Sequence, residues 1–113
     1  MEQEIINRFK KQKRNIENQI QNDYDEDFQF KSITPEKFNN GYCDFFAEVM
    51  SNEYSDIKYM SSDDVDSLFN KIYDFYPKPH AFIKYKNRFY DFENLGGVDN
   101  PLQLKFYQRQ LNK

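Results

Sequence analysis

Residues 80–93 read HAFIKYKNRFYDFE, and this stretch decides the fold because it holds two runs of strand length joined by a dipeptide. The runs HAFIKY and RFYDFE are rich in aromatic and aliphatic residues, which is typical of strands. Lys86 and Asn87 between them predict a hairpin with a two-residue turn. The cross-strand pairs that follow from this turn are Tyr85 with Arg88, Phe82 with Asp91, and His80 with Glu93.

The hairpin contains the only histidine of the chain. Because side chains alternate along a strand, His80, Phe82, Asp91 and Glu93 are expected on one face. A carboxylate on that face can accept the imidazole N–H, fix the tautomer and stabilise the charged ring. Asp91 is the first candidate for this orienting acid and Glu93 the alternative. The other interpretation is a structural or surface histidine in an acidic hairpin.

The only cysteine of the chain stands in a second decisive stretch, NGYCDFFAEVM at residues 40–50. Residues 42–51 are predicted to form an amphipathic helix, because their apolar side chains recur at helical spacing. Those side chains are Tyr42, Phe45, Phe46, Val49 and Met50. Cys43 then lies in the first turn of a helix whose other face is buried.

A cysteine at a helix start is well placed for nucleophilic chemistry. An ordinary thiol has a pKa of about 8.5, and the positive end of a helix dipole or a nearby imidazolium favours the thiolate. Unpaired N–H groups at the same end can donate to a developing oxyanion. Gly41 just before Cys43 lets a substrate backbone come close. The alternative is that Cys43 is a small buried apolar residue, as free cysteines often are.

The order of these parts resembles the papain-like fold in the broad sense that includes transglutaminase-like enzymes and cell-wall amidases. The motifs that carry the resemblance are NGYCDFFAEVM and HAFIKYKNRFYDFENLGGV, within residues 39–104. The chain is similar to minimal bacterial or phage members of that superfamily. The resemblance implies Cys43 as nucleophile, His80 as base and Asp91 as orienting acid. Papain's glutamine ahead of the cysteine has no counterpart, so Asn39, Asn40 and Gly41 are candidates for oxyanion or substrate binding.

The remaining segments complete the expected architecture. Residues 2–22 are predicted to form a helix with one apolar stripe, and the runs FQFKSIT (28–34) and SDIKYM (55–60) to form short strands. Thr34 followed by Pro35 marks a helix start. A further helix is expected from Ser61 or Ser62 to the prolines at 77 and 79, and a last one from Asn100. The expected class is α+β, with a papain-like core in one domain, residues 1–113.

Composition limits the remaining possibilities. The chain has 113 residues with twelve Phe and nine Tyr, which predicts a small domain with an aromatic core. A net charge of -3 argues against a nucleic-acid partner. The single cysteine excludes an intramolecular disulfide and favours a reducing cytosol. Neither a signal peptide, a membrane span, a metal site nor a cofactor is expected.

Two functions remain from different classes. The first is a cysteine-dependent hydrolase of the thiol-protease or amidase type, or an acyl transferase, acting on an amide, isopeptide or ester bond of a protein or peptide. The second is a non-catalytic binding protein of phage or mobile-element origin that sequesters a host protein. A basic run at residues 10–14 is either a solvated helix face or a docking face. The sequence does not predict the oligomeric state.

Overall fold

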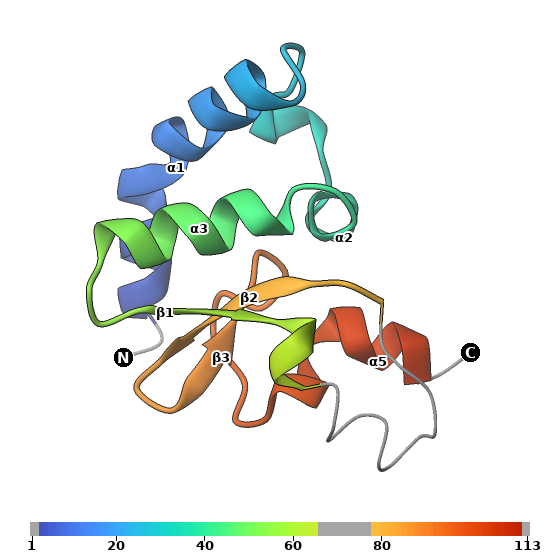
Figure 1. Ribbon diagram of the computed structural model, residues 1–113. Coiled ribbons are helices and arrows are strands. Elements are labelled where there is room, and N and C mark those ends of the chain that lie inside the picture. The colour runs from blue at the N-terminus through green and yellow to red at the C-terminus, as the bar shows by residue number, and fades with distance from the viewer. Residues whose placement is uncertain (1–2, 66–77, 112–113) are drawn as a thin grey trace.

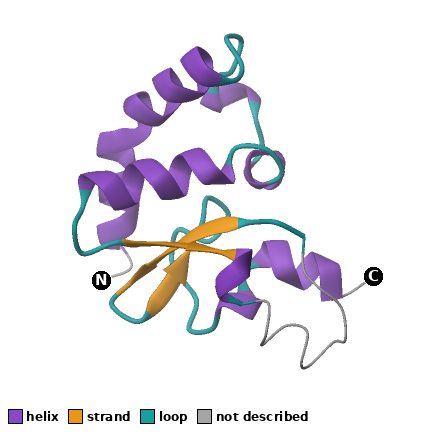
Figure 2. Ribbon diagram, in the orientation of Figure 1, coloured by secondary structure: helices purple, strands orange, loops and turns teal. Residues whose placement is uncertain are grey.

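A computed structural model describes residues 3–65 and 78–111 of the chain. The helices are α1 (Gln3–Asp23), α2 (Pro35–Asn39), α3 (Cys43–Glu53) and α5 (Lys105–Leu111). The strands β1 (Lys58–Ser61), β2 (Ala81–Tyr85) and β3 (Arg88–Tyr90) form one antiparallel sheet in the order β1-β2-β3. Figure 2 shows the helices gathered around this small sheet. The expected α+β class is therefore confirmed.

The elements are arranged in layers on either side of the sheet (Figure 1). Helix α3 packs on the sheet and α1 packs on α3, so α3 lies between a helix and two strands. On the other side of the sheet lie α5 and the preceding 3-10 turn, Pro101–Gln103. Cys43, at the first position of α3, therefore starts the helix that covers the sheet.

Strand β2 is the centre of the sheet and is buried on both faces. Ala81, Ile83 and Tyr85 belong to the larger core under α3 and α1. Phe82 between them belongs to a second core, which also contains Leu104 and Phe106. This alternation follows from the period of two along a strand, and it lets one short segment hold the two halves of the domain together.

The hairpin forms with the predicted turn. Tyr85 pairs with Arg88 and Ile83 pairs with Tyr90. Lys86 and Asn87 both have positive φ, 49° and 64°, as a two-residue turn of the hairpin type requires. Strand β3 ends at Tyr90, so the chain leaves the sheet before the expected pairs of Asp91 and Glu93.

Aromatic rings fill the core between α1, α2 and α3, as composition predicts. Helix α1 buries the predicted stripe of Ile5, Phe9, Ile16 and Ile20. The ring of Phe92 stacks on the ring of Phe38 with centroids 4.3 Å apart, and on the ring of Phe30 at 5.7 Å. These contacts fasten α2 to the segment that follows β3 and so fix the chain just ahead of α3.

Two of the local predictions are wrong. The run FQFKSIT does not form a strand: its centre is a 3-10 turn, Phe30–Ser32, because Phe28 and Phe30 point into the ring cluster instead of pairing with a sheet. The last helix is not continuous from Asn100. Asn100 caps a 3-10 turn, Leu104 leaves helical geometry with ψ 137°, and α5 begins at Lys105.

Of the remaining predicted elements, some are confirmed and one lies largely outside the described residues. Strand β1 lies where SDIKYM predicts one, and Thr34 caps α2 by accepting the Lys37 N–H. Ser61 does cap a turn, but only the 3-10 turn Ser62–Asp64 is described, and the rest of the predicted helix lies outside the described residues. Within the described ranges, no helix has the length and apolar character needed to cross a membrane.

Candidate functional site

Cys43 is held at the start of α3 by the segment that joins α2 to α3. The Tyr42 N–H donates to the Phe38 carbonyl, and the Tyr42 hydroxyl donates to Asp25 Oδ2 at 2.7 Å. Among the described residues, the backbone N–H groups of Cys43 and Asp44 have no hydrogen-bond acceptor. The thiol is half-buried and free. The sulfur of a half-buried cysteine therefore lies beside unpaired donors at a helix N-terminus.

His80 is fixed by its backbone and by its ring. The Ser62 N–H donates to the His80 carbonyl at 2.9 Å, and the Ser62 hydroxyl donates to the Lys78 carbonyl at the same distance. The imidazole stacks on Phe106 of α5, with centroids 4.0 Å apart and planes 7° from parallel. The ring therefore has little freedom to rotate away from the site.

Asp91 orients the imidazole. His80 Nε2 lies 2.9 Å from Asp91 Oδ2, and both side chains are buried. The other carboxylate oxygen, Oδ1, accepts the N–H groups of Glu93 and Asn94, each at 2.9 Å. Three hydrogen bonds thus hold the carboxylate in place.

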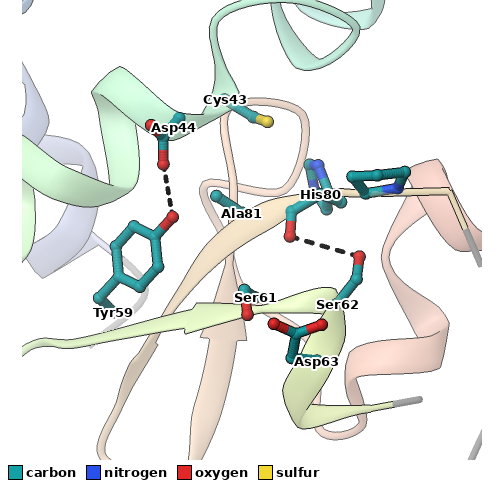
Figure 3. A pocket seen from close by; sticks show the side chains of 9 residues that line it. Cys43, Asp44, Tyr59, Ser61, Ser62, Asp63, His80 and Ala81 are labelled. Carbon is teal, nitrogen blue, oxygen red and sulfur yellow. Dashed lines mark hydrogen bonds between the residues drawn. The ribbon is translucent and has the colours of Figure 1, made fainter.

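The second ring nitrogen of His80 is directed to the side where Cys43 lies. Nδ1 is buried and has no hydrogen bond of ordinary geometry in the described part of the chain. Figure 3 shows the Cys43 sulfur pointing toward the imidazole. Burial lowers the pKa of His80, but the hydrogen bond that the ring donates to Asp91, together with the neighbouring Cys43, outweighs it, so the pKa of His80 is raised above its usual value of 6.5. The ring is therefore a better proton acceptor beside the sulfur than an ordinary histidine.

Cavities open on both sides of Cys43. The first, of about 260 Å³, is lined by Cys43, Asp44, Tyr59, Asp63, Pro79 and His80, among others (Figure 3). The second, of about 430 Å³, is lined by Cys43, Asn39, Asn40, Gly41, Lys78 and Phe106, among others. The sulfur thus lies where a molecule that extends through both cavities would pass.

Asn39 and Glu93 lie in a separate ion-pair network. Glu93 receives two hydrogen bonds from Arg109 at 2.7 and 2.8 Å, and Asn39 Nδ2 donates to Glu93 Oε1 at 2.8 Å. Burial raises the pKa of Glu93, but the hydrogen bonds from Arg109 and Asn39 outweigh it and the pKa is lowered. Of the two acids proposed for His80, the structure therefore brings Asp91 to the ring and directs Glu93 to Arg109.

Asn40 and Gly41, the other two residues proposed for oxyanion or substrate binding, differ in which of their groups can contact a substrate. The Gly41 N–H donates to the Phe38 carbonyl, and the Asn40 N–H donates to Glu36 and Lys37 carbonyls, so neither amide is available. The Asn40 side chain is exposed and lines the larger cavity beside Cys43. A Cβ at Gly41 would meet no protein atom within 4 Å, so the backbone there is open to an approaching molecule.

Sequence reasoning missed the residues that support the site. Ser62 and Phe106 hold His80 in position, and Tyr59 donates a hydrogen bond to Asp44 at the wall of the smaller cavity. Burial and that hydrogen bond raise the pKa of Tyr59, so its hydroxyl remains a donor. No local pattern identifies these residues, because each belongs to a different element from the group it supports.

The described residues contain no group of three or more His, Cys, Asp or Glu side chains that is suited to hold a metal ion. Comparison of the chain with protein-family models, with curated proteins and with solved structures finds no match. The interpretation of the site therefore depends on its geometry.

Proposed function

We propose that the protein is a cysteine-dependent hydrolase or acyl transferase in which Cys43, His80 and Asp91 act as nucleophile, base and orienting acid. One observation carries the proposal. The buried His80 ring bonds Asp91 through Nε2, while its unbonded Nδ1 faces the thiol at the start of α3. A buried nitrogen without a hydrogen bond is unfavourable in a purely structural role, and it is what a base needs before it receives a proton.

The first step transfers the thiol proton of Cys43 to Nδ1 of His80 and leaves a thiolate beside an imidazolium. Asp91 stabilises the imidazolium by accepting the Nε2–H. The thiolate then attacks the carbonyl carbon of an amide, isopeptide or ester, so that a C–S bond forms and the carbonyl electrons move to oxygen.

The oxyanion needs donors close to the sulfur. The Cys43 N–H has no acceptor within the described ranges and lies at the positive end of α3. We assign the second donor to the side chain of Asn40, which lines the cavity next to Cys43, because the Asn39 amide is bonded to Glu93.

Collapse of the tetrahedral intermediate breaks the bond to the leaving group. His80 gives its proton to the departing amine or alkoxide, and the acyl group stays on sulfur as a thioester. Water or an amine, deprotonated by the same ring, then attacks the thioester and releases the acyl group. The site fits both hydrolysis and acyl transfer.

The proposal is tested by turnover of p-nitrophenyl esters at catalytic amounts of protein. We expect a burst of p-nitrophenolate equal to the protein concentration, followed by steady turnover that Cys43→Ala and His80→Gln abolish and Asp91→Asn weakens. Intact-mass spectrometry should detect the acyl group on Cys43. A folded wild-type protein that is acylated no faster than free cysteine, and never turns over, would contradict the enzymatic assignment.

The second candidate is a binding protein of phage or mobile-element origin on the same fold. The observation that favours it is an exposed basic run on α1, formed by Lys10, Lys11, Lys13 and Arg14. A binding protein would need this face and not the thiol. Charge reversal on α1 would then abolish its biological effect, while Cys43→Ala would leave that effect unchanged.

A further inference from the structure

The proposed function does not specify the substrate, and the smaller cavity beside Cys43 indicates one of its features. We infer that this cavity binds a cationic side chain with an apolar stem, that of a lysine or arginine next to the acyl group that Cys43 attacks. The inference depends on the proposed function, and it concerns the charge of the substrate on one side of the sulfur.

Two carboxylates give the cavity its charge. Asp44 and Asp63 line it, and no lysine or arginine does so among the described residues. The Tyr59 hydroxyl donates to Asp44 Oδ1. Within the described ranges, Asp44 Oδ2 has no donor, and Asp63, which is exposed, has no partner. A guanidinium or ammonium group entering the cavity would meet acceptors that no lysine or arginine of the described residues neutralises.

The remaining walls fit the stem of such a side chain. The ring of Tyr59 and the small apolar surfaces of Pro79 and Ala81 line the cavity together with the carboxylates. Lysine and arginine place their methylene groups against apolar surface while the charged head reaches polar groups, and a cation is attracted to a tyrosine ring. The volume of about 260 Å³ lies below the usual range for a whole small-molecule ligand and suits one side chain.

The carboxylates matter because they share the cavity with the reacting groups. His80 lines the same cavity, is 4% exposed, and has the unbonded Nδ1. The cavity on the other side of Cys43 has the opposite character, since Lys78 lines it and, in the part of the chain that the structure describes, no acidic residue does. A substrate with one cationic side chain would therefore enter in one direction, with the cation on the Asp44 side.

The experiment uses the single thiol of the chain as its own reporter. Cys43 is treated with methanethiosulfonates that carry a trimethylammonioethyl, a sulfonatoethyl or a neutral methyl group, and each rate is divided by the rate for N-acetylcysteine amide. We expect the cationic reagent to be favoured over the anionic one by about tenfold, and the preference to shrink in high salt.

Matched variants connect this preference to the cavity. Asp63→Asn removes an exposed, unpartnered carboxylate and should reduce the preference about threefold without affecting the fold, while Asp44→Asn should reduce it similarly. The control is Glu53→Gln, which removes the same charge from an exposed residue at the far end of α3, about 15 Å along the helix axis.

Protection of Cys43 by amino-acid amides distinguishes binding in the cavity from long-range attraction of a charged reagent. Nα-acetyl-arginine amide should slow the reaction of the neutral reagent, whereas the isosteric uncharged acetyl-citrulline amide should not. A charge preference equal to that of the free thiol, one that Asp63→Asn and Asp44→Asn leave intact, or equal protection by both amides would overturn the inference. The outcomes are separable, because the neutral reagent alone reports whether Cys43 is activated, as the proposed function requires.

Discussion

The imidazole of His80 and the carboxylate of Asp91 form a buried pair, 2.9 Å from Nε2 to Oδ2, across the base of a hairpin. His80 precedes β2 and Asp91 follows β3, so the register of the hairpin sets their distance. A turn longer by one residue would place Asp91 on the other face. The short Lys86–Asn87 turn is therefore part of the site, although it lies at the opposite end of the strands.

The titration of His80 tests this pair directly. The protein has one histidine, so its ring resonance is identified in an NMR spectrum of the tag-free chain. The midpoint should lie above 6.5, since the hydrogen bond that the ring donates to Asp91 and the nearby Cys43 together outweigh burial. In Asp91→Asn burial dominates and the midpoint should fall below 6.5, while Cys43→Ala should give an intermediate value. A wild-type midpoint below 6.5 would refute the electrostatic account.

The same shift makes stability depend on pH. The pKa of His80 is raised in the folded state, so its contribution is fully present below about pH 6.5 and is lost as pH rises through the folded pKa. Urea unfolding should therefore show the advantage of the wild type over His80→Gln shrinking with rising pH. If the stability advantage of the wild type over His80→Gln grew with rising pH, the pKa of His80 would be lowered in the folded state, contrary to this account.

Glu93→Gln tests the network that joins α5 to α2. Its side chain is 7% exposed and receives hydrogen bonds from Arg109 and Asn39. The variant should lose on the order of 2 kcal/mol of unfolding free energy at neutral pH. Because the pKa of Glu93 is lowered, the loss is present above about pH 4.5 and disappears as pH falls through the folded pKa. Glu53→Gln, on an exposed site, should change little in the same chemical unfolding series.

Phe38→Ala tests the aromatic core that positions the start of α3. Phe38 is fully buried and stacks on Phe92 at 4.3 Å. Its removal should cost about 3–5 kcal/mol, measured by chemical unfolding. Tyr24→Ala is the aromatic control, because Tyr24 is 68% exposed, and about 0.5 kcal/mol is expected. Equal costs for the two variants would show that the ring stack is not a principal source of stability.

The sequence predicts the helix start and the hairpin well because each is determined by nearby residues. Helical spacing from Tyr42 to Met50 places Cys43 at the first turn of α3, and the Lys86–Asn87 dipeptide sets the strand pairs. Alternation places Asp91 and Glu93 on the face of His80, and the sequence predicts Asp91 as the orienting acid with Glu93 as the alternative. The choice between them depends on Arg109, which donates hydrogen bonds to Glu93. Arg109 belongs to α5, so the hairpin sequence alone does not reveal this partner.

The errors have a similar cause. The run from Phe28 to Thr34 has the composition of a strand, but its rings meet Phe38, which lies outside the run, and Phe92, which lies far along the chain. The short apolar pattern cannot distinguish those two outcomes. The break of the last helix at Leu104 likewise serves packing, since Leu104 is fully buried in the core beneath β2.

The central claim is that His80 activates Cys43, and the rate of alkylation by iodoacetamide at about pH 6 tests it most directly. Less than about one per cent of an ordinary thiol is ionised at that pH. The account predicts that Cys43, the only thiol of the chain, reacts at least tenfold faster than free cysteine and that His80→Gln removes the excess. A wild-type rate equal to or below that of free cysteine, or an unchanged excess in His80→Gln, would contradict it.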